Sequence, residues 1–209
     1  DAKRATQEVV SACLEGPRQV LAQFQEYAYL LTEVLEGLDP MDVASTREKV
    51  ANYRRVGLEV ELLSASAVDF PLFQLQCGDI IEVLSSHAYS LANSCLNATS
   101  ACIKERAGGI LEEWEKTYER ICSTPQDEEE LAQLKDFMAV AEKSVSRPLM
   151  AKTKEVHKQI DMVESFFHEV EPSVVLSAFQ SFEWPTAIQL AIAESERNLE
   201  REKIQFMEE

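Results

Sequence analysis

Glycine, proline and basic residues are all scarce in this sequence. Its 209 residues include 6 Gly and 7 Pro, which are too few for the many tight turns of a β-sandwich or β-barrel. Lys and Arg number 20 against 37 Asp and Glu, so the net charge is −17. Because phosphates and anionic lipid surfaces are bound by clustered basic residues, we expect neither nucleic acid nor a membrane as a partner. No run of about 18 apolar residues, the minimum for a membrane-spanning helix, occurs either.

The basic residues are also unevenly placed, because none lies between Arg55 and Lys104. An exposed helix normally presents charges of both signs. We therefore expect residues 56–103 to be covered, either by the rest of this chain or by a neighbouring protein. If a neighbour covers them, Ala88 and Leu91 are expected at that interface.

Sequence signatures of a catalytic or metal site are missing. The five cysteines, at positions 13, 77, 95, 102 and 122, form no CxxC pair, so they are predicted to be buried, reduced thiols of a cytoplasmic protein. His157 stands among lysines and is predicted to be solvated. No P-loop, HExxH or GxSxG motif occurs. We expect no catalytic, cofactor-binding or metal-binding residue in this chain, and no enzyme activity of its own.

Apolar residues, 45% of the chain, recur at helical spacing in nearly every stretch. A heptad series that starts after Pro17 predicts a helix ended by Gly37 and Asp39-Pro40, and a third helix is predicted after Asp42. The longest series, from Asp79 to Ile121, is interrupted by Gly108 and Gly109. Two adjacent glycines predict either a kink or a partner backbone packed closely at that point.

The C-terminal stretch predicts four further helices. Thr124 and Pro125 predict a helix start, followed by many acidic residues in the first turn. Two amphipathic helices are predicted to form an antiparallel pair through a short turn at residues 146–148. A short helix from residue 172 to 179 follows. Then come Phe182, Trp184 and Pro185, which are predicted to form a structural joint before a last, highly charged helix.

The expected fold class is therefore all-α, an elongated array of antiparallel helical bundles and helix pairs. At most one short extended segment is expected, near residues 70–76, where Pro71 interrupts the helical period. Three segments are predicted: a helical bundle at 1–69, a connector with a long helix at 70–122, and the helical pair, the joint and the charged helix at 123–209. We interpret the chain as a segment of a longer polypeptide.

From Phe70 onward, the order of motifs resembles the tail of axonemal dynein heavy chains, just before the linker region. The similarity rests on Phe70-Pro71-Leu72-Phe73 before a long helix, Ile121-Cys122 with Pro125, Glu129-Glu130-Leu131-Ala132-Gln133-Leu134-Lys135-Asp136-Phe137, the helix from Ile160 to Phe167, Phe182-Glu183-Trp184-Pro185, and Leu199-Glu200-Arg201-Glu202-Lys203 with Phe206. The similarity is most specific after Ile121. Before Phe70 only a compatible helical pattern remains.

This resemblance implies a structural, force-transmitting piece of a large microtubule motor in the axoneme of a cilium or flagellum. ATP and Mg²⁺ would be bound only in the AAA+ motor domain of the parent chain, and the microtubule would be contacted only by other parts of it. The implied partners are other dynein heavy, intermediate or light chains and axonemal docking components. The joint of Phe182, Trp184 and Pro185 would set the angle at which the last helix enters the linker.

Two other functions remain open. The chain could be a stand-alone helical adaptor or tethering protein that binds partner helices in a groove. A spectrin-like array would show internal repeats, and none is visible between the two halves. A helical-bundle enzyme with carboxylate metal ligands would need Glu-x-x-His on two helices, and no such motif occurs.

Overall fold

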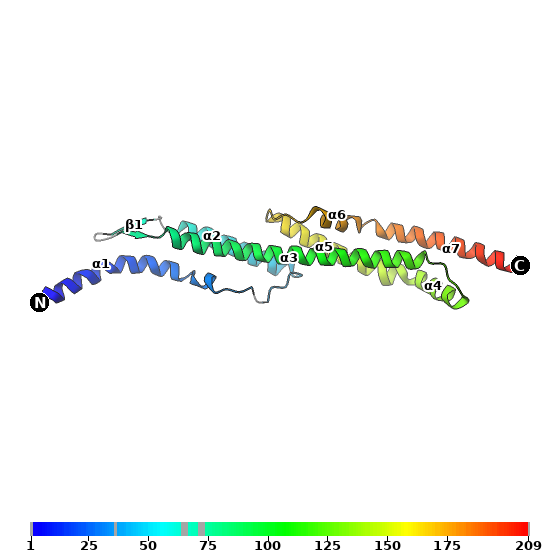
Figure 1. Cartoon of the computed structure of the whole chain (residues 1–209), viewed down its shortest axis with the longest axis horizontal. Helices are drawn as coiled ribbons and strands as arrows, with labels where there is room; N and C mark the ends of the chain where they lie inside the picture. Colours follow the sequence, from blue (N-terminus) through cyan, green and yellow to red (C-terminus); the bar gives the residue numbers. More distant parts are fainter. Residues whose placement is uncertain (1, 36, 64–66, 71–73, 209) are drawn as a thin grey trace. The chain divides into compact units, whose positions relative to one another are not determined.

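The computed structural model (Figure 1) describes residues 2–35, 37–63, 67–70 and 74–208, without the side chains of residues 2, 5, 6 and 201–208. The chain divides into two compact units, Asp1–Ala98 and Thr99–Glu209. Helices dominate both units, so the predicted all-α class is confirmed. The division into three segments stays a prediction. The elements are α1 (Ala2–Gln25), the 3₁₀ helix η1 (Ala28–Leu31), α2 (Val43–Leu62), β1 (Ala67–Asp69), β2 (Gln74–Gln76), α3 (Gly78–Ile121), α4 (Glu128–Ala141), the π-helix η2 (Glu142–Ser146), α5 (Arg147–Ser165), α6 (Pro172–Gln180) and α7 (Trp184–Glu208).

In the first unit, α2 begins as predicted. The Asp42 carboxylate caps the helix by accepting hydrogen bonds from the backbone amides of Ala44 and Ser45, at 3.1 and 3.0 Å. The predicted apolar face is buried at Val50, Tyr53, Val56 and Val60. A Cβ added to Gly57 would lie 2.8 Å from the ring of Tyr89, so α2 and α3 approach closely at this glycine.

The predicted bounds of the first helix are wrong. Instead of starting at Pro17 and ending near Gly37, α1 runs through Pro17 and ends at Gln25, and only the short η1 follows. Pro17 is buried, and a Cβ on the neighbouring Gly16 would meet the ring of Phe70 at 2.5 Å. Tertiary packing therefore keeps a proline inside a helix where the local pattern predicts a helix start.

The extended segment predicted near residues 70–76 contains a strand, but it pairs with a second one. β1 and β2 form an antiparallel hairpin in which Val68 pairs with Leu75. Of the connector Phe70-Pro71-Leu72-Phe73, residues 71–73 lie outside the described residues. The hairpin leads into α3 at Gly78.

The stretch without basic residues is largely covered by this chain itself. Ala88 is 0% exposed and Leu91 is half-buried, and the other buried residues there include Val60, Leu84, Ala92, Cys95, Leu96 and Ile103. Ala88 is therefore a core residue, and its placement at an interface with a neighbouring protein is wrong. Substituting it by Lys would disrupt the unit rather than report on a partner.

Gly108 and Gly109 do not mark a closely packed backbone. Both lie exposed within α3, which continues through them, and a Cβ at either position would have no described atom within 4 Å beyond its own helical surroundings. Close packing of a partner backbone from this chain is therefore excluded at the described residues, and the glycines only lower the helix propensity of α3.

In the second unit, α4 starts at Glu128, three residues later than the predicted capping residue Thr124 would place it. Asp127 is the cap, and its carboxylate accepts a hydrogen bond from the Glu130 amide at 2.8 Å. The Glu130 carboxylate in turn accepts one from the Gln126 amide at 2.8 Å. The predicted acidic first turn is confirmed, because residues 128–130 are all Glu.

The turn predicted at residues 146–148 is wrong. Ser146 (φ −62°, ψ −43°) and Arg147 (φ −65°, ψ −47°) are helical, so α4, η2 and α5 follow one another without a break. The Arg147 amide donates to the carbonyl of Glu142, five residues back. Pro148 lacks an amide hydrogen and would clash with the carbonyl of an ideal α-helix four residues back. The local π-helical widening accommodates Pro148, and no hairpin forms there.

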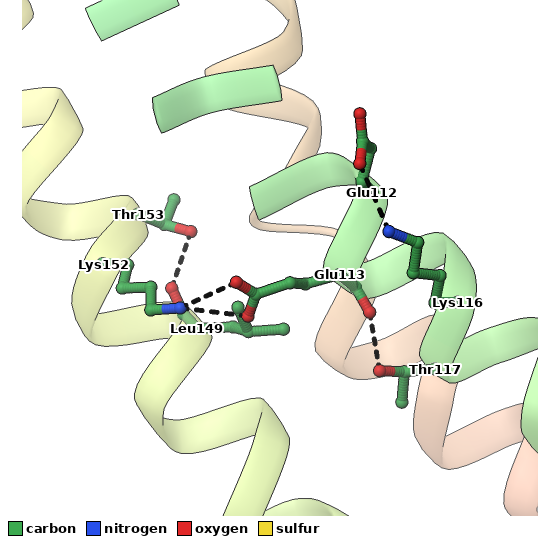
Figure 2. Close-up of polar contacts among 7 residues, drawn as sticks. All are labelled: Glu112, Glu113, Lys116, Thr117, Leu149, Lys152 and Thr153. Carbon is green, nitrogen blue, oxygen red and sulfur yellow. Dashed lines mark hydrogen bonds and ion pairs between the residues drawn. The ribbon is translucent and has the colours of Figure 1, made fainter. Parts of the chain in front are cut away.

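The antiparallel pair of this unit is formed by α3 and α5 instead. The Lys152 ammonium contacts both carboxylate oxygens of Glu113, at 2.9 and 3.0 Å, and Figure 2 shows this bridge between the two helices. Seven residues further along α5, Gln159 accepts a hydrogen bond from Arg106, which lies seven residues earlier in α3. Moving seven residues forward along α5 therefore corresponds to moving seven residues backward along α3, so the two helices are antiparallel. The face predicted for α5 is buried, but Phe167, past the end of the helix at φ 56°, is 96% exposed.

Candidate structural joint at the start of α7

Trp184, the first residue of α7, packs against the C-terminal part of α3. Its ring is stacked on Trp114, with centroids 6.4 Å apart and an interplanar angle of 5°. Tyr118, one turn further along α3, meets the same ring edge-on at 5.9 Å. Aromatic pairs at these distances are attractive beyond the area that they bury. These three rings therefore fix the start of α7 to α3.

Trp114 is the centre of this aromatic contact. Its side chain is 0% exposed, and its Nε1 has no hydrogen-bond partner in the part of the chain that the structure describes. A buried indole N–H usually finds an acceptor, because leaving it unpaired costs free energy. Apolar burial and ring stacking, rather than a directed polar bond, therefore hold the Trp114–Trp184 contact.

Phe182 makes a separate contact, with α5. Its ring lies 4.6 Å from the ring of His157, and Phe179 of α6 lies at the same centroid distance from that histidine. The His157 Nε2 is 3.1 Å from the carbonyl oxygen of Ala178. Because a carbonyl oxygen only accepts, Nε2 carries the hydrogen and donates it to this bond. The prediction that His157 is solvated is wrong: it is half-buried and links α5 to the end of α6.

Pro185 occupies the first turn of α7, as predicted. The helix starts one residue earlier, at Trp184, and the amides of Thr186 and Ala187 both donate to the carbonyl of Glu183, at 3.1 and 3.2 Å. Pro185 also lines a groove between α5 and α7. The three predicted joint residues thus contact different neighbours, since Trp184 faces α3 while Phe182 and Pro185 face α5.

Two titratable groups among the described residues of this unit, Tyr118 and Glu171, have shifted pKa values. The hydrogen bond between Tyr118 and the Cys122 thiol raises the pKa of Tyr118. The ion pair with Lys104, at 2.8 Å, lowers the pKa of the Glu171 carboxyl, and a hydrogen bond from Ser173 adds to this effect. Among the described residues, no group of three or more His, Cys, Asp or Glu side chains could hold a metal ion.

The cysteines agree only in part with the predicted buried thiols. All five are free, and Cys77 and Cys95 are buried, but Cys122 is exposed and two others are half-buried. Burial raises the pKa of the Cys95 thiol, which favours the unreactive protonated form. Cys122 lies one residue past the end of α3, in the α3–α4 connection, where it is exposed.

Three residues that contact the joint were not predicted from sequence to do so: Trp114 and Tyr118 on α3, and His157 on α5. A signal for the first two existed, because the chain has only two Trp and Trp114 and Tyr118 stand four residues apart on one helical face. For His157 the neighbouring lysines suggested the opposite environment, and no local signal indicated Phe179 and Phe182 as its neighbours.

Comparison with protein-family models found no match to this chain, and no curated protein matches it either. No helix in the described ranges is long and apolar enough to cross a membrane. Function must therefore be argued from the geometry of the chain and from the motif resemblance.

Proposed function

We propose that this chain is a segment of a dynein heavy chain tail that transmits force between the ATP-driven motor domain and its axonemal attachment. The observation that supports this role most directly is the Trp114–Trp184 stack. Its Trp184 belongs to the Phe-Glu-Trp-Pro motif on which the resemblance depends, and the stack holds the start of α7 against α3.

Helix continuity in the second unit also suits a load-bearing role. α4, η2 and α5 contain 14, 5 and 19 residues and follow one another without a break. At about 1.5 Å per residue this helical run is roughly 55 Å long. Two ion pairs connect this part of the chain to α3. Lys152 of α5 pairs with Glu113, and Glu171, which follows α5, pairs with Lys104. Packed antiparallel helices of this kind resist bending better than a single helix.

The coding sequence beyond the Glu209 codon tests the parentage. A dynein tail predicts that it continues into a linker region and several P-loop AAA+ modules. A stop codon within a few dozen codons would overturn the proposal.

The mechanical role has a test of its own in the complete heavy chain. Trp184→Ala should reduce microtubule gliding velocity or ciliary beat force while the ATPase activity of the motor is retained, because only the transmission of force is affected. Phe167→Ala is a matched control, since Phe167 is 96% exposed. Equal motility of the two variants would contradict a mechanical role for the joint.

The second candidate function is a stand-alone helical adaptor. The open groove between α5 and α7 favours it, because grooves between packed helices commonly accept a partner helix. An adaptor needs no motor domain in the same chain, so the coding sequence distinguishes the two functions.

A further inference from the structure

An open groove of about 410 Å³ lies between α5 and α7 in the second unit. Its floor is apolar, with Met150 from α5 and Ile188 and Ile192 from α7. Ile188 is 1% exposed, whereas Met150 and Ile192 are only half-buried. Apolar atoms therefore remain open to solvent along this seam, although both helices belong to the packed core of the unit.

The residues that line the groove follow the period of a helix-binding surface. On α5 they stand at 147, 150, 151 and 154, and on α7 at 185, 188, 189 and 192, while η2 adds 142 and 146 at one end. The α5 set and the α7 set both have the spacing i, i+3, i+4, i+7, which is one continuous helix face over two turns, about 10 Å long. Two parallel ridges with an apolar floor between them match the face of a third helix.

The charged residues that line the groove are two cations, Arg147 and Lys154, and one acid, Glu142, so the lining has a net positive charge in a strongly acidic chain. Residues 142–158 contain five basic residues and two acidic ones, Glu142 and Glu155, while the chain as a whole has a net charge of −17. A local excess of one charge beside an apolar groove selects a partner of the opposite charge.

The contacts within this chain do not account for these two cations. Lys152 is paired with Glu113 on the face towards α3, and Lys158 with Glu155 on its own helix. Lys154 makes no ion pair with any residue that the structure describes. Arg147 contacts Glu142 at 3.4 Å, with the two side chains 68% and 61% exposed. Such a long, solvated pair contributes little, so Arg147 can exchange partners readily.

We propose that the groove between α5 and α7 binds an acidic amphipathic helix of a partner protein. Apolar side chains on one face of that helix pack against Met150, Ile188 and Ile192, and its flanking Asp or Glu residues pair with Arg147 and Lys154. This inference goes beyond the proposed force transmission and does not depend on it, because the groove and its charge are the same in a dynein tail and in an adaptor.

The test uses the whole chain and a fluorescent synthetic peptide of about three heptads, long enough to be helical. The peptide has Leu and Ile at its apolar positions and Glu at the flanking ones, and a second peptide has Lys in place of each Glu. Fluorescence anisotropy measures both affinities. The Glu peptide should bind, and its affinity should fall as salt is added. The Lys peptide should bind at least about tenfold more weakly.

Two charge reversals on the same helix provide the matched comparison. Lys154→Glu should weaken binding of the Glu peptide about fivefold or more, because an attraction becomes a repulsion. Lys158→Glu makes the same change on an exposed lysine outside the groove and should leave the affinity within about twofold. Both variants should retain the circular dichroism spectrum of the original chain, since both lysines are exposed.

Several results would overturn the proposal. These are no binding of the Glu peptide, equal binding of the two peptides, or equal effects of the two reversals. Binding of phosphatidylserine vesicles that only Lys154→Glu abolishes, without binding of the peptide, would assign the groove to an anionic membrane surface. Dimerisation of the chain that only Lys154→Glu abolishes would assign it to a second copy.

Discussion

Truncation of Trp184 to Ala should lower the free energy of unfolding of the second unit by about 3–4 kcal/mol. A fully buried aromatic side chain removes about 150–250 Å² from water, and Trp184 is half-buried. About 100 Å² of lost burial at about 25 cal/mol per Å² corresponds to about 2.5 kcal/mol. Loss of the stack on Trp114, 6.4 Å away, adds about 0.5–1.5 kcal/mol.

Urea unfolding followed by far-UV circular dichroism measures this loss. Intrinsic fluorescence is unsuitable because the chain has only two Trp, and both belong to the contact. Trp184→Phe keeps a smaller ring in place and should cost only about 1 kcal/mol. A double-mutant cycle with Trp114→Phe and Trp184→Ala should give a coupling of about 0.5–1.5 kcal/mol.

Phe167→Ala is the control, because Phe167 is 96% exposed and its truncation should change stability by less than about 0.5 kcal/mol. A loss of less than about 1 kcal/mol for Trp184→Ala, or additive effects of the Trp114 and Trp184 substitutions, would refute the reasoning. The start of α7 would then be held by contacts other than the ring stack.

Three further outcomes are expected. Gly108→Ala should raise the free energy of unfolding by about 0.5–1 kcal/mol in urea denaturation, since nothing described lies within 4 Å of the added methyl group; a destabilised variant would contradict this. A thiol reagent should label exposed Cys122 rapidly in the native chain, and Cys95, buried and with a raised pKa, only after unfolding; equal labelling rates by mass spectrometry would contradict it. The Glu171 pKa is lowered by Lys104, so this pair stabilises the fold above the ordinary value of 4.5, and the contribution is lost as pH falls through the lowered pKa. NMR titration should show the Glu171 pKa rising in Lys104→Met, and an unchanged value would exclude the ion pair as the cause.

Local chemistry predicted much of the helical framework correctly. Asp42 caps α2 because its side-chain oxygen accepts from the two amides that a helix start leaves free. The apolar period of α5 places Leu149, Val156 and Ile160 in the core, because a spacing of three and four residues returns to one face of a helix. The short helix from Pro172 also forms as predicted.

Two predicted helix boundaries that depended on a proline failed. Pro17 lies inside α1, and Pro148 follows a π-helical segment, although both positions suggest a boundary from sequence. Whether a helix ends at a proline depends on what the widened or bent helix gains by packing onto its neighbours. A local pattern contains no information about that gain.

By itself, the sequence determined that the chain is helical and acidic and which face of most helices is buried, because these properties follow from residues a few positions apart. Only the tertiary structure decided that α5 pairs with α3 rather than with α4, and that Trp184 stacks on Trp114. It also placed His157 between two phenylalanine rings and left the net positive lining of the α5–α7 groove beside open apolar atoms. The ring contacts and the ion pair join residues that lie between 22 positions (His157 and Phe179) and 70 positions (Trp114 and Trp184) apart in the sequence. They therefore depend on how whole helices pack and not on the pattern within any one of them.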